Sequence, residues 1–292
     1  IARHYHTQRA DKVLPDLDLR HFVELTEGCS PADLETMVNQ AGIIAVKSGE
    51  MIASATLMQA AERVLVGNVN DNTTQDRSRD RRIIAVHEWG HFLMDFQHQR
   101  KLVGGDWDTL QSEMKTIKIS LKANPRNNAL GFVLHKQGNN LLKTKGDMEH
   151  DVRVLLAGMA NEELFFGEDG TTSGAHNDIS QVTRLLHRAV GELGMYRKTR
   201  LNYAALTKDG STVAPDEETR SIMEAQSERL YLETKAALVP LKDLTEHLTA
   251  CLMKSGEMTL RETLGEIRQF EKEALPHANP FAGSHSHALI AV

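Results

Sequence analysis

The N-terminal quarter of the chain carries apolar residues at the spacing of amphipathic helices. From 34 to 45 an apolar side chain recurs every three or four positions, which predicts a helix with one buried face. Ser30 suits the N-cap of this helix, Pro31 its first position and Asp33 its first turn. A similar stripe predicts a second helix over 54–66.

A polar segment separates this region from the rest of the chain. Residues 68–75 read Asn-Val-Asn-Asp-Asn-Thr-Thr-Gln, a composition typical of a loop or linker. We therefore expect a small helical unit at 1–67 and a separate domain at 76–275. Residues 276–292 contain proline, glycine, serine and histidine, and we expect them to form a disordered tail.

The second region mixes helical and strand patterns. Apolar residues flank 87–91 on both sides, which predicts a buried helix. Residues 116–122 alternate apolar and polar side chains, and 130–134 form a short apolar run, so we expect a two-stranded hairpin. Helical patterns cover most of the remainder, at 147–167, 177–191 and 216–273. The predicted fold is therefore mainly α, with a helical unit followed by a largely helical domain that contains a small β-sheet.

The composition narrows the classes of function. The 292 residues carry a formal net charge of −6 and a pI of about 6.2, which disfavours a nucleic-acid-binding surface because phosphate recognition needs clustered Lys and Arg. Cys29 and Cys251 lie far apart, which fits a reducing compartment. No apolar run reaches the roughly 18 residues of a membrane span. Because the chain begins at Ile1 in mid-pattern, we expect it to be part of a longer protein.

The segment His87-Glu88-Trp89-Gly90-His91 carries the strongest candidate chemistry. His87 and His91 are four residues apart and share a helix face, so both can present a ring nitrogen to one zinc ion. Glu88 can reach a zinc-bound water, whose pKa the metal lowers to about 7. The carboxylate can then take the proton while the hydroxide attacks a peptide carbonyl. We therefore predict a zinc peptidase site.

A zinc site of this kind needs a third protein ligand. Four residues downstream are candidates. Glu162 lies on a predicted helix, Asp178 lies at a helix start after a glycine-rich loop, and His150 and His176 are further possibilities. Spacing alone leaves all four open.

Six short segments, in this order along the chain, resemble motifs of the FtsH family of membrane-bound, ATP-dependent zinc metalloproteases. They are 28–34 (GFSGADL in the family), 38–41 (VNEA), 87–91 (HEAGH), 129–132 (ALG followed by V or F), 160–167 (AEExxxG) and 172–179 (STGASNDI). The interval from Glu162 to Asp178 is 16 residues, the same as between the matching Glu and Asp of the family. Several motifs in one order and spacing are far more specific than HExxH alone.

The resemblance implies a role for each residue of the site. His87, His91 and Asp178 would ligate one zinc ion per chain. Glu88 would be the general base. Glu162 would be a neighbouring carboxylate that orients a ligating imidazole.

The resemblance also implies a domain arrangement and an assembly. Residues 1–67 would be an AAA+ lid subdomain, and 76–275 a zincin-type peptidase domain. The assembly would be a homo-hexameric ring with enclosed peptidase sites, on the cytoplasmic face of a membrane, acting on protein substrates and not on nucleic acid. Extended substrate would pair by strand addition with a strand that contains Leu130, Gly131, Phe132 and Val133.

The chain departs from the family pattern at three points. Trp89 replaces an alanine beside the metal ligands, and Pro31 replaces a glycine in the lid motif. No GxxxxGK[ST] segment occurs, so ATP, Mg²⁺ and the membrane anchor would belong to segments upstream of Ile1. Two alternatives are a degenerate homologue that acts as a scaffold or chaperone, and a helical interaction module with an accidental HExxH. The intact candidate site disfavours the first, and the ordered motifs disfavour the second.

Overall fold

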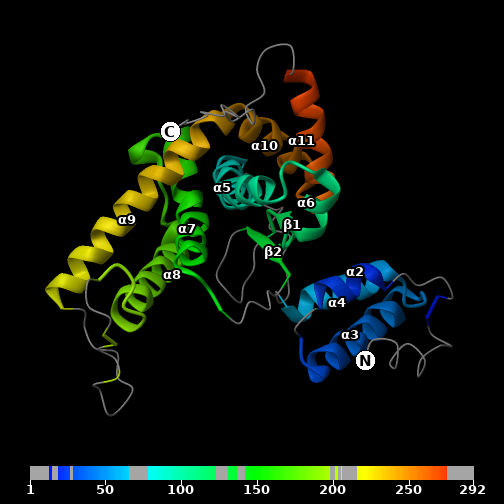
Figure 1. The fold of residues 1–292 in the computed structure, drawn as a ribbon. Helices are drawn as coiled ribbons and strands as arrows, with labels where there is room; N and C mark the ends of the chain where they lie inside the picture. Colours follow the sequence, from blue (N-terminus) through cyan, green and yellow to red (C-terminus); the bar gives the residue numbers. More distant parts are fainter. Residues whose placement is uncertain are drawn as a thin grey trace, which may run out of the picture.

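The computed structural model describes residues 13–14, 19–26, 29–65, 78–122, 131–136, 142–197, 201–202, 205 and 216–274. Helices dominate this part of the chain, together with one three-stranded sheet. The mainly α fold with a small β-sheet is therefore confirmed. Figure 1 shows a smaller group of N-terminal helices beside a larger group built around helix α5. The expected linker and tail, 68–75 and 276–292, lie outside the described residues.

The smaller group consists of α2 (Arg20–Leu25), α3 (Pro31–Ser48) and α4 (Ser54–Leu65). Helix α3 begins with a capping box, in which the Ser30 hydroxyl accepts from the Asp33 N–H at 3.2 Å and the Asp33 carboxylate accepts from the Ser30 N–H at 3.1 Å. Helix α3 ends at Gly49, whose φ of 72° is left-handed. The predicted apolar faces form the core of this group, and their buried members are Leu34, Met37, Val38, Ala41, Ala45, Leu57, Ala60 and Ala61.

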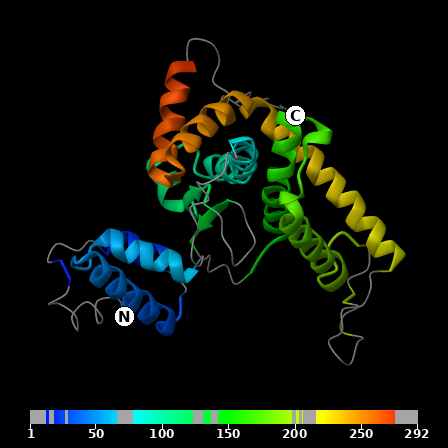
Figure 2. The same ribbon diagram turned by 180° about the vertical axis from the view of Figure 1, so that it is seen from behind.

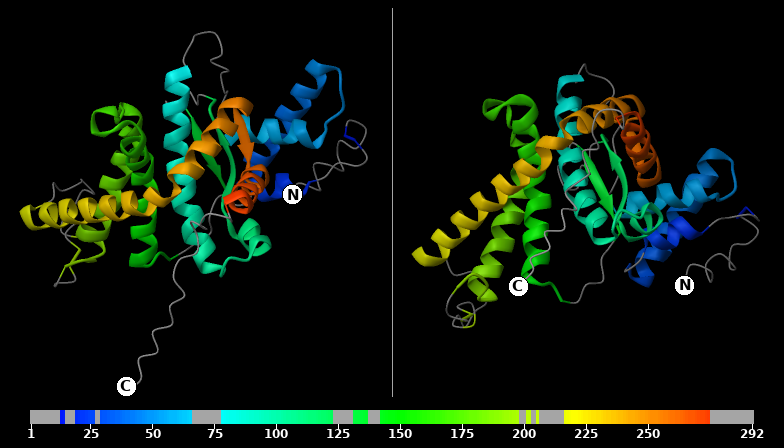
Figure 3. Two further views of the ribbon diagram at one scale, coloured as in Figure 1. Left: turned by 90° about the horizontal axis from the view of Figure 1, so that it is seen from above. Right: turned by 45° about the horizontal axis from the view of Figure 1, so that its top comes forward.

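Helix α5 (Ser78–Leu102) is the centre of the larger group. Helix α7 (Lys145–Phe166) lies along one side of α5 and the sheet lies on the other, while α10 (Lys242–Ser255) crosses above it (Figures 2 and 3). Trp89, Phe92 and Phe96 of α5 are fully buried in the main core. Because each large apolar side chain contributes about 1.5–3 kcal/mol on burial, this core anchors the helix that carries the candidate ligands.

The remaining helices surround this centre. None of the helices in the described ranges combines the length and hydropathy needed to cross a membrane. A π-helical turn, Arg188–Glu192, extends α8, and single 3₁₀ turns occur at Glu168–Gly170, Ser173–Ala175 and Val239–Leu241. The helices are α6 (Trp107–Glu113), α8 (His176–His187), α9 (Glu217–Leu238) and α11 (Leu260–Ala274).

The sheet has the order β2-β1-β3, and both pairings are antiparallel. The hairpin prediction is confirmed with shifted bounds, since β1 covers Thr116–Ser120 and β2 covers Phe132–His135. Strand β3, Glu257–Thr259, lies within 216–273, where the sequence predicted helices and no strand. Gly256 causes the difference, because its φ of 79° ends α10, and its carbonyl accepts from the N–H of Leu121 at 2.9 Å.

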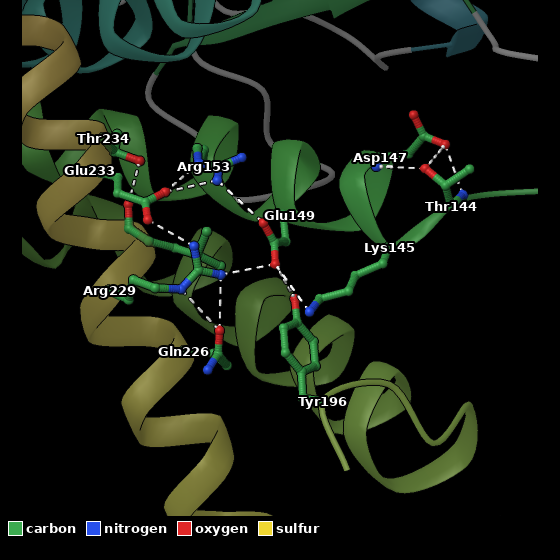
Figure 4. Close-up of polar contacts among 11 residues, drawn as sticks. Thr144, Lys145, Asp147, Glu149, Arg153, Tyr196, Gln226, Arg229, Glu233 and Thr234 are labelled. Atoms are coloured by element: carbon green, nitrogen blue, oxygen red, sulfur yellow. Dashed lines mark hydrogen bonds and ion pairs between the residues drawn. The ribbon is translucent and has the colours of Figure 1, made fainter. Parts of the chain in front are cut away.

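A network of charged residues ties α7 to α9 (Figure 4). Glu149 of α7 accepts from the Tyr196 hydroxyl and from Arg229 of α9, both at 2.9 Å. Arg153, one turn along α7, donates to Glu233 of α9 at 2.8 Å. A carboxylate that accepts from several cationic and hydroxyl donors is well satisfied at a half-buried position. The network therefore fixes the N-terminal half of α7, whose C-terminal half faces the candidate site.

Candidate metal centre

Helix α5 presents two imidazoles on one face. The rings of His87 and His91 lie edge to face, with centroids 4.7 Å apart. Their side chains are only 10% and 12% exposed, so they are almost fully removed from water. Trp89 lies on the opposite face, fully buried against Phe92 with ring centroids 5.6 Å apart. The bulk of Trp89 therefore fills the core and does not enter the space beside the imidazoles.

Two glycines allow α5 and α7 to approach closely. A Cβ on Gly90 would lie 2.3 Å from the carbonyl oxygen of Ala157. A Cβ on Gly158 would lie 2.5 Å from Cε1 and Nε2 of His87. Both positions thus have no room for a side chain, although a glycine inside a helix lowers helix stability by up to about 1 kcal/mol relative to alanine. The role of these glycines was not predicted from the sequence. The signal that could have indicated it was a glycine in the middle of each of two predicted helices.

Asp178 completes the group from the first turn of α8. Its Oδ2 lies 3.1 Å from Nε2 of His87 and 3.4 Å from Nε2 of His91. The three side chains bring one possible ligand atom each to within 4.8 Å of one another. Of the four candidates that spacing left open, the structure brings Asp178 to the two imidazoles.

The other nitrogen of each imidazole has an acceptor of its own. Nδ1 of His87 lies 2.6 Å from Oε1 of Glu162, and Nδ1 of His91 lies 2.7 Å from the carbonyl oxygen of Val154. A carbonyl or a carboxylate can only accept, so both Nδ1 atoms carry hydrogen. Glu162 is itself buried, and its Oε2 accepts from the N–H of Thr172 at 2.6 Å. Glu162 therefore lies behind His87, and not among the three converging atoms.

This arrangement directs three electron pairs toward one point. When the two rings are neutral, with hydrogen on Nδ1 only, both Nε2 atoms offer lone pairs, as does Oδ2 of Asp178. Burial lowers the pKa of His87, but its contacts with Asp178 and Glu162 outweigh burial and raise that pKa to about 10. Burial raises the pKa of Asp178, but the two imidazoles hold it below its ordinary value. Without a metal, a proton on His87 therefore supplies the positive charge between the carboxylates, and a bound metal ion would replace that proton. Two imidazoles with one carboxylate form a donor set that zinc prefers.

Glu88 lies next to the first imidazole and near the start of β2. Its side chain is buried, and burial raises the pKa of its carboxyl group, although His87 and His91 oppose that effect. A Cβ on Gly131 would lie 3.3 Å from Oε1 of Glu88 and 2.5 Å from a methyl carbon of Ile84. Gly131 therefore has to be small for β2 to pass this close to the carboxylate.

The remaining predicted residues fall at different places. Phe132 and Val133 lie in β2, Gly131 directly precedes it, and Leu130 lies outside the described residues. His150 lies 3.1 Å from Asp95 through Nε2 and stacks on His98, so its ring has other partners. His176 is exposed at the start of α8. Pro31 occupies the first turn of α3, in the N-terminal group of helices.

Residues 74–262 match the family described as Peptidase family M41. The chain belongs to peptidase family M41. Residues 16–56 match the AAA+ lid domain. The M41 match contains all residues of the candidate centre, and the lid match falls on the smaller group of helices. The predicted resemblance to FtsH-type zinc metalloproteases is thereby confirmed.

Curated relatives of this M41 chain carry the name "ATP-dependent zinc metalloprotease FtsH". The protein of Aquifex aeolicus is 35% identical over 192 residues, which cover 65% of this chain and 28% of the relative. The protein of Thermus thermophilus is 30% identical over 264 residues, which cover 87% of this chain and 40% of the relative. The M41 chain thus spans less than half of the length of these relatives.

Proposed function

We propose that this chain is the zinc-dependent endopeptidase part of an FtsH-type protease, and that it cleaves peptide bonds of unfolded proteins. The observation that carries the proposal is the convergence of His87, His91 and Asp178 on one point, with Glu88 buried beside them. The membership of family M41 and the names of the relatives support the same activity and metal.

In this proposal His87, His91 and Asp178 hold the zinc ion. Hydrogen bonds from Nδ1 of the two histidines, to Glu162 and to the Val154 carbonyl, keep both rings aimed at the ion. When bound, zinc supplies Lewis acidity that lowers the pKa of water to about 7 and polarises a peptide carbonyl.

Glu88 acts as the general base. One of its carboxylate oxygens accepts a proton from the attacking water, and the same oxygen returns it to the leaving amine nitrogen. Its burial supports this role, because the raised pKa makes the carboxylate a stronger base than an exposed glutamate.

Strand β2 is the proposed site of substrate pairing. It is an edge strand of the described sheet, so no strand in the described part of the chain pairs with its outer edge, where an extended peptide could add. Gly131 supports this proposal, because a Cβ there would lie 3.3 Å from Oε1 of Glu88, so the start of the strand lies close to the proposed base. Pairing through main-chain groups suits a protease that accepts many sequences.

The wider assembly is proposed from the relatives' names and the lid match. We assign 1–67 to an AAA+ lid, 68–75 to a linker and 76–275 to the peptidase domain, which the matches at 16–56 and 74–262 support. In the full-length protein, ATP and Mg²⁺ would bind to an ATPase core outside this chain. That protein would form a homo-hexamer anchored at the cytoplasmic face of a membrane.

Glu88→Gln tests the proposed chemistry. The substitution keeps the size of the side chain but removes the base, so cleavage of unfolded casein should fall by at least about 100-fold while the zinc content stays at the wild-type level. The matched control is Glu113→Gln on exposed α6, which should cleave at the wild-type rate. Undiminished cleavage by Glu88→Gln would refute the assigned role, and absence of cleavage by the wild-type chain with bound zinc would favour the scaffold alternative.

A further inference from the structure

A second group of possible metal ligands lies between α10 and α11. His247 and Cys251 are four residues apart on one face of α10, and Glu266 faces them from α11. Nε2 of His247 lies 3.0 Å from Oε2 of Glu266, and Sγ of Cys251 lies 3.6 Å from the same oxygen. Sγ lies 3.9 Å from Nε2 of His247. Three atoms of three different donor types therefore form a small triangle.

The size of this triangle fits one tetrahedral zinc ion. With zinc bonds of about 2.0–2.3 Å, tetrahedral angles separate nitrogen and oxygen ligands by roughly 3.3 Å and sulfur from either by roughly 3.6 Å. The observed separations of 3.0, 3.6 and 3.9 Å each depart from these values by only a few tenths of an ångström. A zinc ion could bind with small side-chain rotations and no movement of the helices.

The residues around the triangle hold the His247 ring in place and leave the triangle accessible to a metal ion from solvent. The ring of Phe270, one turn after Glu266 on α11, packs on the imidazole of His247 with centroids 5.4 Å apart. The side chains of His247 and Glu266 remain 32% and 36% exposed, so solvent can reach the triangle and occupy a fourth position. Because a thiolate is a soft ligand, the set favours Zn²⁺ or Co²⁺ over Mg²⁺ or Ca²⁺.

We propose that His247, Cys251 and Glu266 form a second binding site for a zinc-class divalent cation, which clamps α10 to α11. The clamp would stabilise the edge of the sheet formed by β3, because β3 connects these two helices. This site shares no residue with the group at His87, His91 and Asp178. It also differs from that group in chemistry, because only the second site contains sulfur.

Cobalt binding tests the site, because thiolate ligation of Co²⁺ produces an intense near-ultraviolet charge-transfer absorption that nitrogen and oxygen ligands do not. The reduced whole chain, freed of metal, is titrated with Co²⁺ alone. We expect two bound equivalents and the charge-transfer absorption. Cys251→Ser should bind one equivalent and lose this absorption, whereas the matched control Cys29→Ser should retain both equivalents and the absorption.

Two further variants test the other ligands. His247→Ala and Glu266→Gln should each lower the Co²⁺ affinity, measured through the charge-transfer absorption, by at least about 100-fold. Loss of a residue that only hydrogen-bonds to a metal ligand already lowers metal affinity by about 10–100-fold. The d–d absorption of the first Co²⁺ equivalent, which reports the other site, should remain in all variants and shows that they are folded. Absence of the charge-transfer absorption in the wild-type chain would overturn the proposal. So would its persistence in Cys251→Ser or in both ligand variants.

Discussion

Gly158 offers a sharp test of how the metal centre is built. This residue lies in α7, and the ring of His87 rests directly on it. In Gly158→Ala the new Cβ would lie 2.5 Å from Cε1 and Nε2 of His87 and 2.8 Å from Cδ2. Ordinary carbon contacts begin near 3.5 Å, so the ring must retreat by about 1 Å. The retreat displaces Nε2, the proposed ligand atom, from its present position relative to Asp178 and His91.

The expected effect on function is large, whereas the effect on folding is small. A misplacement of about 1 Å in a catalytic constellation costs on the order of 100-fold in rate, and we expect zinc affinity to fall by about 10–100-fold. The alanine itself favours the helix by up to about 1 kcal/mol, which offsets part of the steric cost. Gly158→Ala should therefore remain folded, with impaired zinc binding and impaired cleavage of unfolded casein.

The assay compares two glycine variants of the same helix. Zinc affinity is measured by competition with a chelator, cleavage by release of peptides, and stability by thermal unfolding. Gly146→Ala is the matched control, because its new Cβ would meet only the Thr144 hydroxyl oxygen at an ordinary 3.7 Å. Wild-type zinc affinity and cleavage in Gly158→Ala would refute the claim that this glycine makes room for the His87 ring.

Three other substitutions probe the surroundings of the centre. Glu162→Gln should lower zinc affinity by about 10–100-fold in the same competition assay, because Nδ1 of His87 loses its anionic acceptor. Lys118→Met should reduce the free energy of unfolding, measured in urea, by about 1–3 kcal/mol, because two glutamates on α4 and β3 lose their buried cation. The loss should be smaller than for a fully buried ion pair, because both glutamates are partly exposed. Asp95→Asn should weaken the acid dependence of stability. Burial raises the pKa of Asp95, but the hydrogen bond and charge of His150, together with His135 and Gln99, lower it more. The contribution of Asp95 therefore exists at neutral pH and is lost as the pH falls below about 4. Urea titrations of this variant and the wild type at pH 7 and well below pH 4 should show a larger deficit at pH 7.

The pairing of the two proposed metal ligands on α5 was predictable because a helix has one fixed geometry. Residues four apart share a face, so His87 and His91 follow from local sequence alone. The same rule could have assigned Trp89, since a residue two positions from each histidine points to the other side of the helix. Asp178 is different, because it reaches the site through the packing of α8 on α7, and only the ordered series of motifs pointed to it.

The residues that sequence reasoning missed are those whose importance depends on a neighbour. Gly90 and Gly158 look like weak positions in two helices until the helices are packed together. Strand β3 has only three residues between strong helix formers, so no periodicity marks it. Its pairing with β1 is a tertiary effect that requires Gly256 to end α10 at the right place.

Glu162 explains how ligands from α5 and α8 meet at one point. Its Oε1 accepts from Nδ1 of His87 and its Oε2 accepts from the N–H of Thr172, both at 2.6 Å. One buried carboxylate thus orients an imidazole on α5 and holds the turn that leads to Asp178 on α8. Glu162 can therefore control the shape of the proposed metal site without contact with the ion.

The cost of this arrangement favours an enzyme over a scaffold. Two imidazole nitrogens and a carboxylate oxygen approach one another in a site that is at most 17% exposed, with a second carboxylate behind His87. Without a metal ion, a proton on His87 has to compensate the two carboxylates, which is why the pKa of this histidine is raised, and burying this charge is costly. Apolar side chains of similar size would pack α5, α7 and α8 with greater stability. The geometry therefore agrees better with the proposed metal-dependent peptidase, in which three of these residues hold the ion and Glu162 orients His87, than with a purely structural role.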